Sequence, residues 1–278
     1  MKKISRRSFM AAAAVSVAAL AMTACGGSAS SAASSVASSA ASSEAASSAA
    51  AAELTTVEAG KLTMATNAAF PPYEMTTDAG EFEGIDVDTA KAIAEKLGLE
   101  LQIDDMDFDA ALLSVQQGKA DIVMAGVTVT DERKAVMDFS DSYATGIQSI
   151  IVPEGSDITS PDDLAGKKIG TQRGTTGYIY CSDDFGDENV VAYDDGLTAV
   201  QALNNGQVDA VVIDNAPAQE FVAANPGLKV LDTSYAEEDY AIGVAKGSAL
   251  EDAVNKALEE LKADGTLQAI VDKYINAN

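Results

Sequence analysis

The sequence contains no histidine, no tryptophan and only two cysteines among its 278 residues. Without histidine, an imidazole cannot act as a general base or complete a catalytic triad, and the usual zinc ligand sets cannot form. Cys25 lies near the N-terminus, which leaves Cys181 alone within the expected fold and excludes an internal disulfide there. We therefore expect neither a metal site nor a cofactor.

Positive charge is also scarce. The chain has 18 lysines and arginines against 43 aspartates and glutamates, so its formal net charge is −25. A surface of this sign repels phosphates, which argues against nucleic acid as a partner.

The N-terminus resembles an export signal over residues 1–24. Four basic residues precede an apolar stretch that is shorter than the roughly 20 residues a transmembrane helix requires. Its cleavage would remove those four charges and lower the net charge from −25 to −29. The pair Arg6 and Arg7 also fits a twin-arginine signal, and the choice between that export route and the general one stays open.

Cys25 follows small residues and precedes glycine in "LAMTACGG", which resembles a bacterial lipoprotein cleavage box. The resemblance implies that Cys25 carries the lipid anchor, palmitate included. The alternative is a plain signal peptide with an incidental cysteine. Residues 25–57 are mostly serine and alanine and have no spaced large apolar residues, which predicts a flexible tether.

Apolar runs typical of strands alternate with helical stretches from Leu62 onward, which indicates parallel α/β layers. A weak repeat relates residues 109–126 to residues 196–214: each has a helix, a glycine, and an aspartate that opens an apolar strand. When Asp121 is aligned with Asp209, Gly126 falls on Asp214, so both stand at a strand end. Ligands bind outside the carboxyl ends of such strands. We expect two similar lobes that share one cleft.

Arg133 is the unusual residue of the stretch "AGVTVTDER", at the start of an expected helix that Thr130 caps. A guanidinium fits a carboxylate with two parallel hydrogen bonds. The backbone N–H groups of Gly126 and Thr128, and the Thr128 hydroxyl, could add donors. The alternative is a surface ion pair between Arg133 and one of the acids beside it.

Six stretches in order resemble the family 3 solute-binding proteins of ABC importers, of the amino-acid-binding type. They are "ATNAAFPPYEM", "GIDVDTAKAIAEKLG", "MDFDAALLSVQQGKADIVMAGVTVTDERKAVMDFSDSY", "DLAGKKIGTQRGTTG", "GQVDAVVIDNAPAQ" and "KALEELKADGTLQAIVDKY". The likeness covers residues 63–274, which is essentially the whole expected fold.

The resemblance implies roles for the residues that would bind the α-groups of an amino acid. Arg133 would bind the α-carboxylate, with help from Gly126 and Thr128, and Asp214 would accept the α-ammonium. Taken alone, Asp214 could instead cap the segment that follows it. Thr175 and Thr176 lie in the turn after Gly174, at a helix N-terminus that suits an anion.

The resemblance also implies a side-chain pocket. Phe70 and Phe108 would sandwich the ligand side chain, although either one alone could be core. Gln172 stands where the family varies with side-chain preference. Asn67 stands where basic-selective members place an acid, which favours a neutral or polar amino acid. Asp86 lies in a family motif, and we interpret it as a helix cap.

The expected fold is the two-lobed type II periplasmic-binding-protein-like fold. Each lobe would be a mostly parallel sheet with helices on both faces, and two strands would cross between lobes near 144–147 and 236–240. Lobe 1 would comprise residues 58–146 plus 239–278, and lobe 2 residues 147–238.

The expected function is a monomeric, extracytoplasmic, lipid-anchored binding protein that delivers a free amino acid to the permease and ATPase of an ABC importer. It would not be an enzyme. The alternatives are a sensor domain that works with a membrane receptor, and a cyclohexadienyl dehydratase-like enzyme on the same fold.

Overall fold

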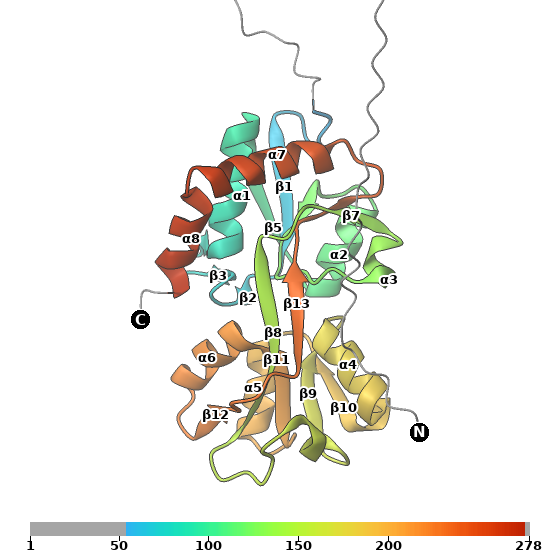
Figure 1. The fold of residues 1–278 in the computed structure, drawn as a ribbon, viewed down its shortest axis with the longest axis vertical. Helices are drawn as coiled ribbons and strands as arrows, with labels where there is room; N and C mark the ends of the chain where they lie inside the picture. The colour runs from blue at the N-terminus through green and yellow to red at the C-terminus, as the bar shows by residue number, and fades with distance from the viewer. Residues whose placement is uncertain (1–53, 276–278) are drawn as a thin grey trace, which may run out of the picture. The chain divides into compact units, whose positions relative to one another are not determined.

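The computed structural model describes residues 54–275 (Figure 1). The expected signal peptide, Cys25 and the tether up to residue 53 lie outside these residues. Leu54 packs against the core, and the Val57 N–H donates to Asp121 Oδ1 at 2.7 Å, so the described chain joins the fold from its first residues. No helix among residues 54–275 is long and apolar enough to cross a membrane.

The first lobe is built on a five-stranded sheet with the order β5-β1-β6-β14-β7. The strands are β1 (Lys61–Thr66), β5 (Glu100–Asp105), β6 (Ile122–Val123), β7 (Met137–Phe139) and β14 (Gly243–Ala245). The helices are α1 (Ile85–Leu97), α2 (Phe108–Gln116), α3 (Asp131–Lys134), α7 (Leu250–Ala263) and α8 (Thr266–Ile275). A small sheet beside them contains β2 (Ala69–Phe70), β3 (Glu74–Thr76) and β4 (Phe82–Glu83).

The second lobe is built on a sheet with the order β10-β9-β11-β8-β12, and β13 also pairs with β8. The strands are β8 (Ala144–Pro153), β9 (Ile169–Gln172), β10 (Val190–Tyr193), β11 (Ala210–Asp214), β12 (Leu228–Val230) and β13 (Ala236–Tyr240). The helices are α4 (Thr176–Phe185), α5 (Gly196–Asn204) and α6 (Asn215–Ala224), with short 3₁₀ turns η1 (Pro161–Leu164) and η2 (Asp187–Asn189).

Two strands, β8 and β13, run between the lobes (Figure 1). They pair antiparallel, with Ala144 opposite Tyr240 and Gln148 opposite Ala236. The two-lobed α/β fold with two crossings is therefore confirmed. The lobe boundaries at 146/147 and 238/239 stay a prediction, because each falls inside one of these continuous strands.

Both sheets are mixed rather than mostly parallel. β1 runs parallel to β5 and β6, and β9 runs parallel to β10 and β11. The chain returns from lobe 2 through β13, and its next strand, β14, lies antiparallel to β6 and β7. Likewise β8 enters lobe 2 antiparallel to β11. Each crossing thus places one reversed strand, β14 or β8, second from the edge of its sheet.

The helices form where apolar spacing and glycine end signals predict them. Gly98 ends α1 with φ 71°, and its N–H donates to the carbonyls of Ala94 and Glu95. In α7, Leu250, Val254, Leu258 and Leu261 recur at spacings of three and four residues, and all four are buried. The positive φ of Gly265, 82°, separates α7 from α8.

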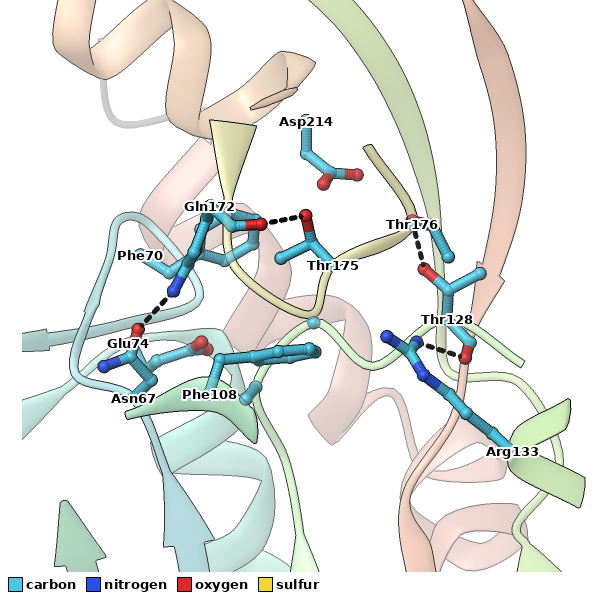
Figure 2. Close-up of a pocket in the computed structure, with 12 residues that line it drawn as sticks. Asn67, Phe70, Glu74, Phe108, Thr128, Arg133, Gln172, Thr175, Thr176 and Asp214 are labelled. Carbon is cyan, nitrogen blue, oxygen red and sulfur yellow. Dashed lines mark hydrogen bonds between the residues drawn. The ribbon is translucent and has the colours of Figure 1, made fainter. Parts of the chain in front are cut away.

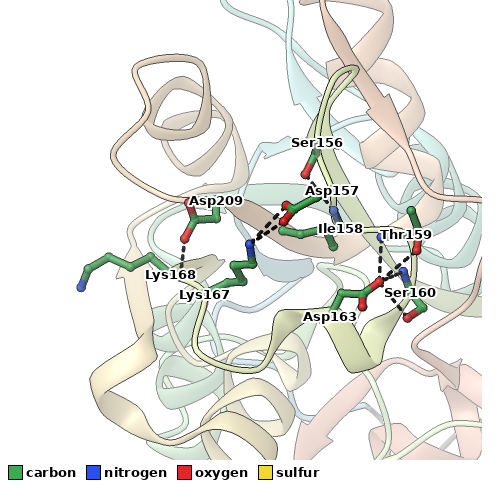
Figure 3. A network of polar contacts seen from close by, with 9 residues as sticks. All are labelled: Ser156, Asp157, Ile158, Thr159, Ser160, Asp163, Lys167, Lys168 and Asp209. Carbon is green, nitrogen blue, oxygen red and sulfur yellow. Dashed lines mark hydrogen bonds and ion pairs between the residues drawn. The ribbon is translucent and has the colours of Figure 1, made fainter.

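The internal repeat is present in three dimensions. α2 and α5 each have nine residues, and Gly118 and Gly206 follow them with φ of 66° and 67°. Asp121 accepts from the Thr63 N–H at 2.8 Å and donates its own N–H to the Thr63 carbonyl. Asp209 makes the same pair of bonds with Lys168 (Figure 3). Each aspartate thus fixes the start of its strand against the neighbouring strand.

The far edge of lobe 2 is held by a polar network around η1 (Figure 3). Asp163 Oδ2 accepts from the N–H and hydroxyl groups of Thr159 and Ser160, at 3.0 to 3.1 Å. These bonds lower the pKa of Asp163, and the one from the Thr159 N–H has the largest effect. The network is remote from the site described below. Cys181 is buried in the core of this lobe, among residues of β8, β9 and β11.

Candidate functional site

A cavity lies where the ends of strands from both lobes meet. All ten residues expected to bind ligand line it, together with Glu74 and Ala125, which the sequence analysis did not select (Figure 2). The ten are Asn67, Phe70, Phe108, Gly126, Thr128 and Arg133 from lobe 1, and Gln172, Thr175, Thr176 and Asp214 from lobe 2. The fold thus brings the predicted set together.

Arg133 is a buried cation with 8% of its surface exposed. Thr130 caps its single-turn helix as predicted, since the Thr130 hydroxyl accepts from the Arg133 N–H at 3.2 Å. The guanidinium donates to the carbonyls of Thr128 at 2.7 Å and of Gly174, in the other lobe, at 3.1 Å. It lies 5.4 Å from the centre of the Phe108 ring.

No ion pair among residues 54–275 includes Arg133, so the alternative of a surface pair with a neighbouring acid is wrong. Burial lowers the pKa of the guanidinium, although Glu238 counteracts the shift. A buried cation without a bonded anion is ready to receive a carboxylate.

Asp214 ends β11 and stands at the start of α6, but its side chain makes no capping bond. Its Oδ2 accepts from Gln148 Nε2 at 2.7 Å, and its Oδ1 accepts a very short hydrogen bond from the Tyr240 hydroxyl. Burial raises the pKa of Asp214 to about 7, against the lowering effect of the Tyr240 bond. The capping alternative is therefore wrong, and the carboxyl faces the cavity.

Glu238 is a buried hinge residue that the sequence analysis did not identify. It lies on β13, and its Oε2 accepts from the Thr128 hydroxyl and from Gln148 Nε2, both at 3.0 Å. The Thr128 hydroxyl also lies 3.4 Å from that of Thr176 in lobe 2. The Thr128 hydroxyl proton is thus already donated within the protein. No local sequence signal marks Glu238, because its partners come from other strands and loops.

Asp86 does not cap its helix, which corrects the sequence interpretation. Gly84 holds the cap position, while Asp86 Oδ2 accepts from the Gly126 N–H at 3.0 Å and Oδ1 from the Tyr143 hydroxyl at 2.7 Å. The Gly126 N–H is therefore already bonded, and Gly126 contributes to the site as a close-packed turn. Its φ is 54°, and a Cβ there would lie 2.8 Å from Phe70. Burial raises the pKa of Asp86 to about 6.

The other end of the cavity is formed by Asn67, Gln172 and Glu74, with Phe70 and Phe108 as apolar walls (Figure 2). Gln172 Nε2 donates to Asn67 Oδ1 at 2.8 Å and so bonds the lobes to each other. Glu74 is fully buried, and burial raises its pKa well above the ordinary value. The stretch "FPPYEM" contains this acid, but its burial depends on the β2–β3 turn.

Thr175 caps α4 by accepting from the Tyr178 N–H at 3.3 Å, as the anion-binding turn requires. The first N–H groups of a helix lack partners within it and favour negative charge. Arg173, a conceivable second cation, is exposed and lies 3.5 Å from Asp194. It does not line the cavity. No cluster of metal-ligating side chains occurs in the part of the chain that the structure describes.

The model of the bacterial extracellular solute-binding proteins, family 3, matches residues 62–277. The chain belongs to this family. Among curated members, it is 34% identical over 272 residues to a probable histidine-binding protein of Neisseria gonorrhoeae, covering 95% of this chain and 94% of that protein. It is 34% identical to an L-cystine-binding protein of Escherichia coli K12, covering 80% and 85%.

Solved structures of amino-acid-binding proteins are also similar to this chain. An ancestral arginine-binding protein bound to glutamine has a TM-score of 0.75 and 44% identity, and the match covers 78% of this chain and 98% of that one. The arginine-, lysine-, histidine-binding protein of Geobacillus stearothermophilus has a TM-score of 0.75 and 35% identity, with 78% and 96% covered.

The family member described here is thus an extracytoplasmic amino-acid-binding protein of an ABC importer. Its relatives are binding proteins, so it is not an enzyme.

Proposed function

We propose that the protein encloses one free amino acid between its lobes, with Arg133 on the α-carboxylate and Asp214 on the α-ammonium. The observation that carries the proposal is that these two opposite charges line one cavity and come from different lobes (Figure 2). Arg133 makes no ion pair within residues 54–275, and the two side chains of that range that donate to Asp214, Gln148 and Tyr240, are uncharged. A zwitterion supplies both missing charges.

Binding favours closure because the ligand contacts both lobes at once. A ligand shifts an open–closed equilibrium only through contacts that differ between the two states. In the structure the lobes already touch across the cavity through Arg133–Gly174 and Gln172–Asn67. An enclosed amino acid would add its α-groups to these contacts. We infer that the closed form is the one presented to the importer.

The test is a thermal-melt screen of the purified chain, stripped of carried-over ligand by unfolding and refolding, against the twenty amino acids and cystine. A ligand present at 100 times its Kd adds about 2.7 kcal/mol to the free energy of unfolding. A rise confined to one chemical group of amino acids supports the proposal. No rise with any amino acid contradicts it.

We also propose that the mature protein is a monomer anchored by lipidated Cys25. The cysteine follows a cleavage box and precedes 28 residues of serine- and alanine-rich chain before Leu54. The exposed large apolar residues of the described chain lie far apart in the sequence: Val57, Leu113, Val136, Ile179, Leu197 and Ile275. Cys25→Ser should move the protein from the membrane fraction to the soluble one, where light scattering gives its mass. A variant that stayed in the membrane would exclude this anchor.

A further inference from the structure

Gln148 is a buried amide on β8, one of the two strands that cross between the lobes (Figure 1). The pairing of β11 with β8 sets Gln148 opposite Asp214, and the pairing of β13 with β8 sets it opposite Ala236. Paired residues of neighbouring strands have their side chains on one face of the sheet, and so do residues two apart on one strand. Asp214, Gln148 and Glu238 therefore share one face of three adjacent strands.

The Gln148 amide bonds both acids of this row. Its Nε2 donates to Asp214 Oδ2 at 2.7 Å and to Glu238 Oε2 at 3.0 Å. A carboxylate only accepts hydrogen bonds, so the opposite amide orientation would place an oxygen against two acceptors. Gln148 Oε1 instead lies against Gly177 in the first turn of α4, where a Cβ would be 2.8 Å from it. The glycine thus leaves room for the amide in the orientation that bonds both acids.

The hydrogen bonds continue from Glu238 to the cation of the other lobe. Glu238 Oε2 also accepts from the Thr128 hydroxyl at 3.0 Å, and the Thr128 carbonyl accepts from Arg133 Nη1 at 2.7 Å (Figure 2). These contacts form one chain of five buried side chains, the hinge network: Asp214, Gln148, Glu238, Thr128 and Arg133. The hinge network joins the acid of lobe 2 to the cation of lobe 1 through β8 and β13.

The separation of the two charges matters because both α-groups of an amino acid are attached to one carbon atom. A site that pairs both groups needs its cation and its anion at a matching distance. Buried side chains hold such a distance when their own hydrogen bonds fix their orientation. Arg133 and Asp214 come from different lobes, so their separation depends on the strands between them, and the hinge network links them there by hydrogen bonds.

We propose that Gln148 and Glu238 are positioning residues of the amino-acid site, which hold Asp214 and Thr128 so that the two charges match the α-groups. The inference rests on the proposed function. Neither Gln148 nor Glu238 lines the cavity, so both act through the residues that do. The hinge network acts on groups that all amino acids share. The neutral or polar side chain that Asn67 favours in the sequence therefore stays a separate prediction.

The experiment is calorimetric titration of the full chain carrying Cys25→Ser with each of the twenty L-amino acids and L-cystine, repeated with Gln148→Met. Methionine is unbranched and of similar size, but it cannot donate, so both bonds of the amide are lost. Every amino acid that the parent binds should bind roughly tenfold more weakly, as expected for the loss of a hydrogen bond to a charged group. The factor should be the same for all of them. The exposed Gln201→Met, on α5, is the matched control and should change none.

Two variants of Glu238 separate its role as an acceptor from its size. Glu238→Gln keeps an oxygen that can accept from both the Thr128 hydroxyl and the Gln148 amide, so affinity should fall by less than about threefold. Glu238→Met removes the acceptor and should weaken binding roughly tenfold. Equal affinities of the two variants would mean that Glu238 only fills space, and would overturn its role.

A double-mutant cycle tests whether Gln148 acts through Asp214. In the Asp214→Asn background, Gln148→Met should weaken binding by less than about threefold, because the hinge network then ends on a group without charge. A tenfold loss in both backgrounds would place the action of Gln148 elsewhere and overturn the inference. If Gln148→Met does not fold, or Asp214→Asn binds too weakly to titrate, the comparison of the two Glu238 variants decides.

The remaining outcomes distinguish this inference from the proposed function. Unchanged or tighter binding by Gln148→Met would overturn the inference alone, and so would a loss confined to some of the amino acids. Failure of the parent to bind any amino acid would overturn the proposed function as well.

Discussion

Replacing Asp214 by asparagine should weaken amino-acid binding and yet stabilise the ligand-free protein at high pH. The folded-state pKa is raised from 3.8 to about 7, mainly by burial. In the unfolded chain this carboxyl loses its proton near pH 4, while in the folded chain it keeps the proton up to about pH 7. The folded state thus binds more protons in this window, and its stability falls as the pH rises from about 4 to about 7.

The size of this effect follows from the shift. The difference between 3.8 and about 7 is about three pKa units, and at 1.36 kcal/mol per unit it costs on the order of 4 kcal/mol above pH 7. Asparagine does not titrate, so Asp214→Asn escapes this cost. Its amide nitrogen faces a donor, either Gln148 Nε2 or the Tyr240 hydroxyl, and loses a bond worth about 1 kcal/mol. The net gain at pH 8 is about 2 to 3 kcal/mol.

The assay is denaturant unfolding of ligand-free protein at pH 5 and pH 8. At pH 5 the variant should be equally stable or slightly less stable than the parent, and at pH 8 more stable. The exposed Asp157→Asn is the control and should shift both curves alike, since this side chain is solvated in either state. At pH 8 the variant should also bind its amino acid at least tenfold more weakly, because the α-ammonium loses a buried partner. Equal stability differences at the two pH values would refute the reasoning, since they would mean that burial does not raise the pKa of Asp214.

Other variants test the remaining parts of the site. Arg133→Ala should lose about 2 to 5 kcal/mol of binding free energy by calorimetry, because the ligand carboxylate loses its cation. The domain should still fold, with a lower Tm, since the carbonyls of Thr128 and Gly174 lose a donor. The exposed Arg173→Ala is its control, and equal losses of binding in both would contradict the assignment. Gly126→Ala should lower Tm and weaken binding, because a Cβ there would lie 2.8 Å from a ring carbon of Phe70. The control Gly118→Ala has nothing within 4 Å of its Cβ and should lose only the roughly 1 kcal/mol of stability that its positive φ costs. Equal losses of unfolding free energy in the two variants would contradict the packing argument. Tyr143→Phe should lower the free energy of unfolding by about 1 to 3 kcal/mol, because the buried Asp86 carboxyl loses a hydrogen-bond donor at 2.7 Å. The loss should be larger at pH 8 than at pH 5, since this hydrogen bond favours the ionised form of Asp86. A loss that did not depend on pH would contradict this.

Local signals predicted most of the helices and strands, because each depends on residues close in the chain. Gly98, Gly118 and Gly265 end helices where the apolar spacing breaks, and Thr130 begins one. The prediction was less exact where an element is short or where partners decide its length. The strand that Asp121 was expected to open is only Ile122–Val123, and the helix after Thr130 is a single turn.

The strand-end alignment selected Gly126 and Asp214, the helix start selected Arg133 with Thr128 beside it, and the resemblance supplied the other six predicted residues. Sequence reasoning misread Asp86 and did not find Glu74 or Glu238. Asp86 bonds Gly126, 40 residues away, and Glu238 bonds Thr128, 110 residues away. No periodicity within a window of the chain reports such contacts.

By itself the sequence determined the elements, the two similar lobes, and the charges available for an amino acid. It did so because periodicity, caps and charge are local properties. Only the tertiary structure decided which of those charges remain unpaired. The Gly126 N–H and the Asn67 amide are bonded within the protein, while Arg133 lies buried without an ion pair among residues 54–275. Burial and pairing depend on what the rest of the chain places around a residue, and so they decide both the shifted pKa values and the ligand that the cavity is proposed to take.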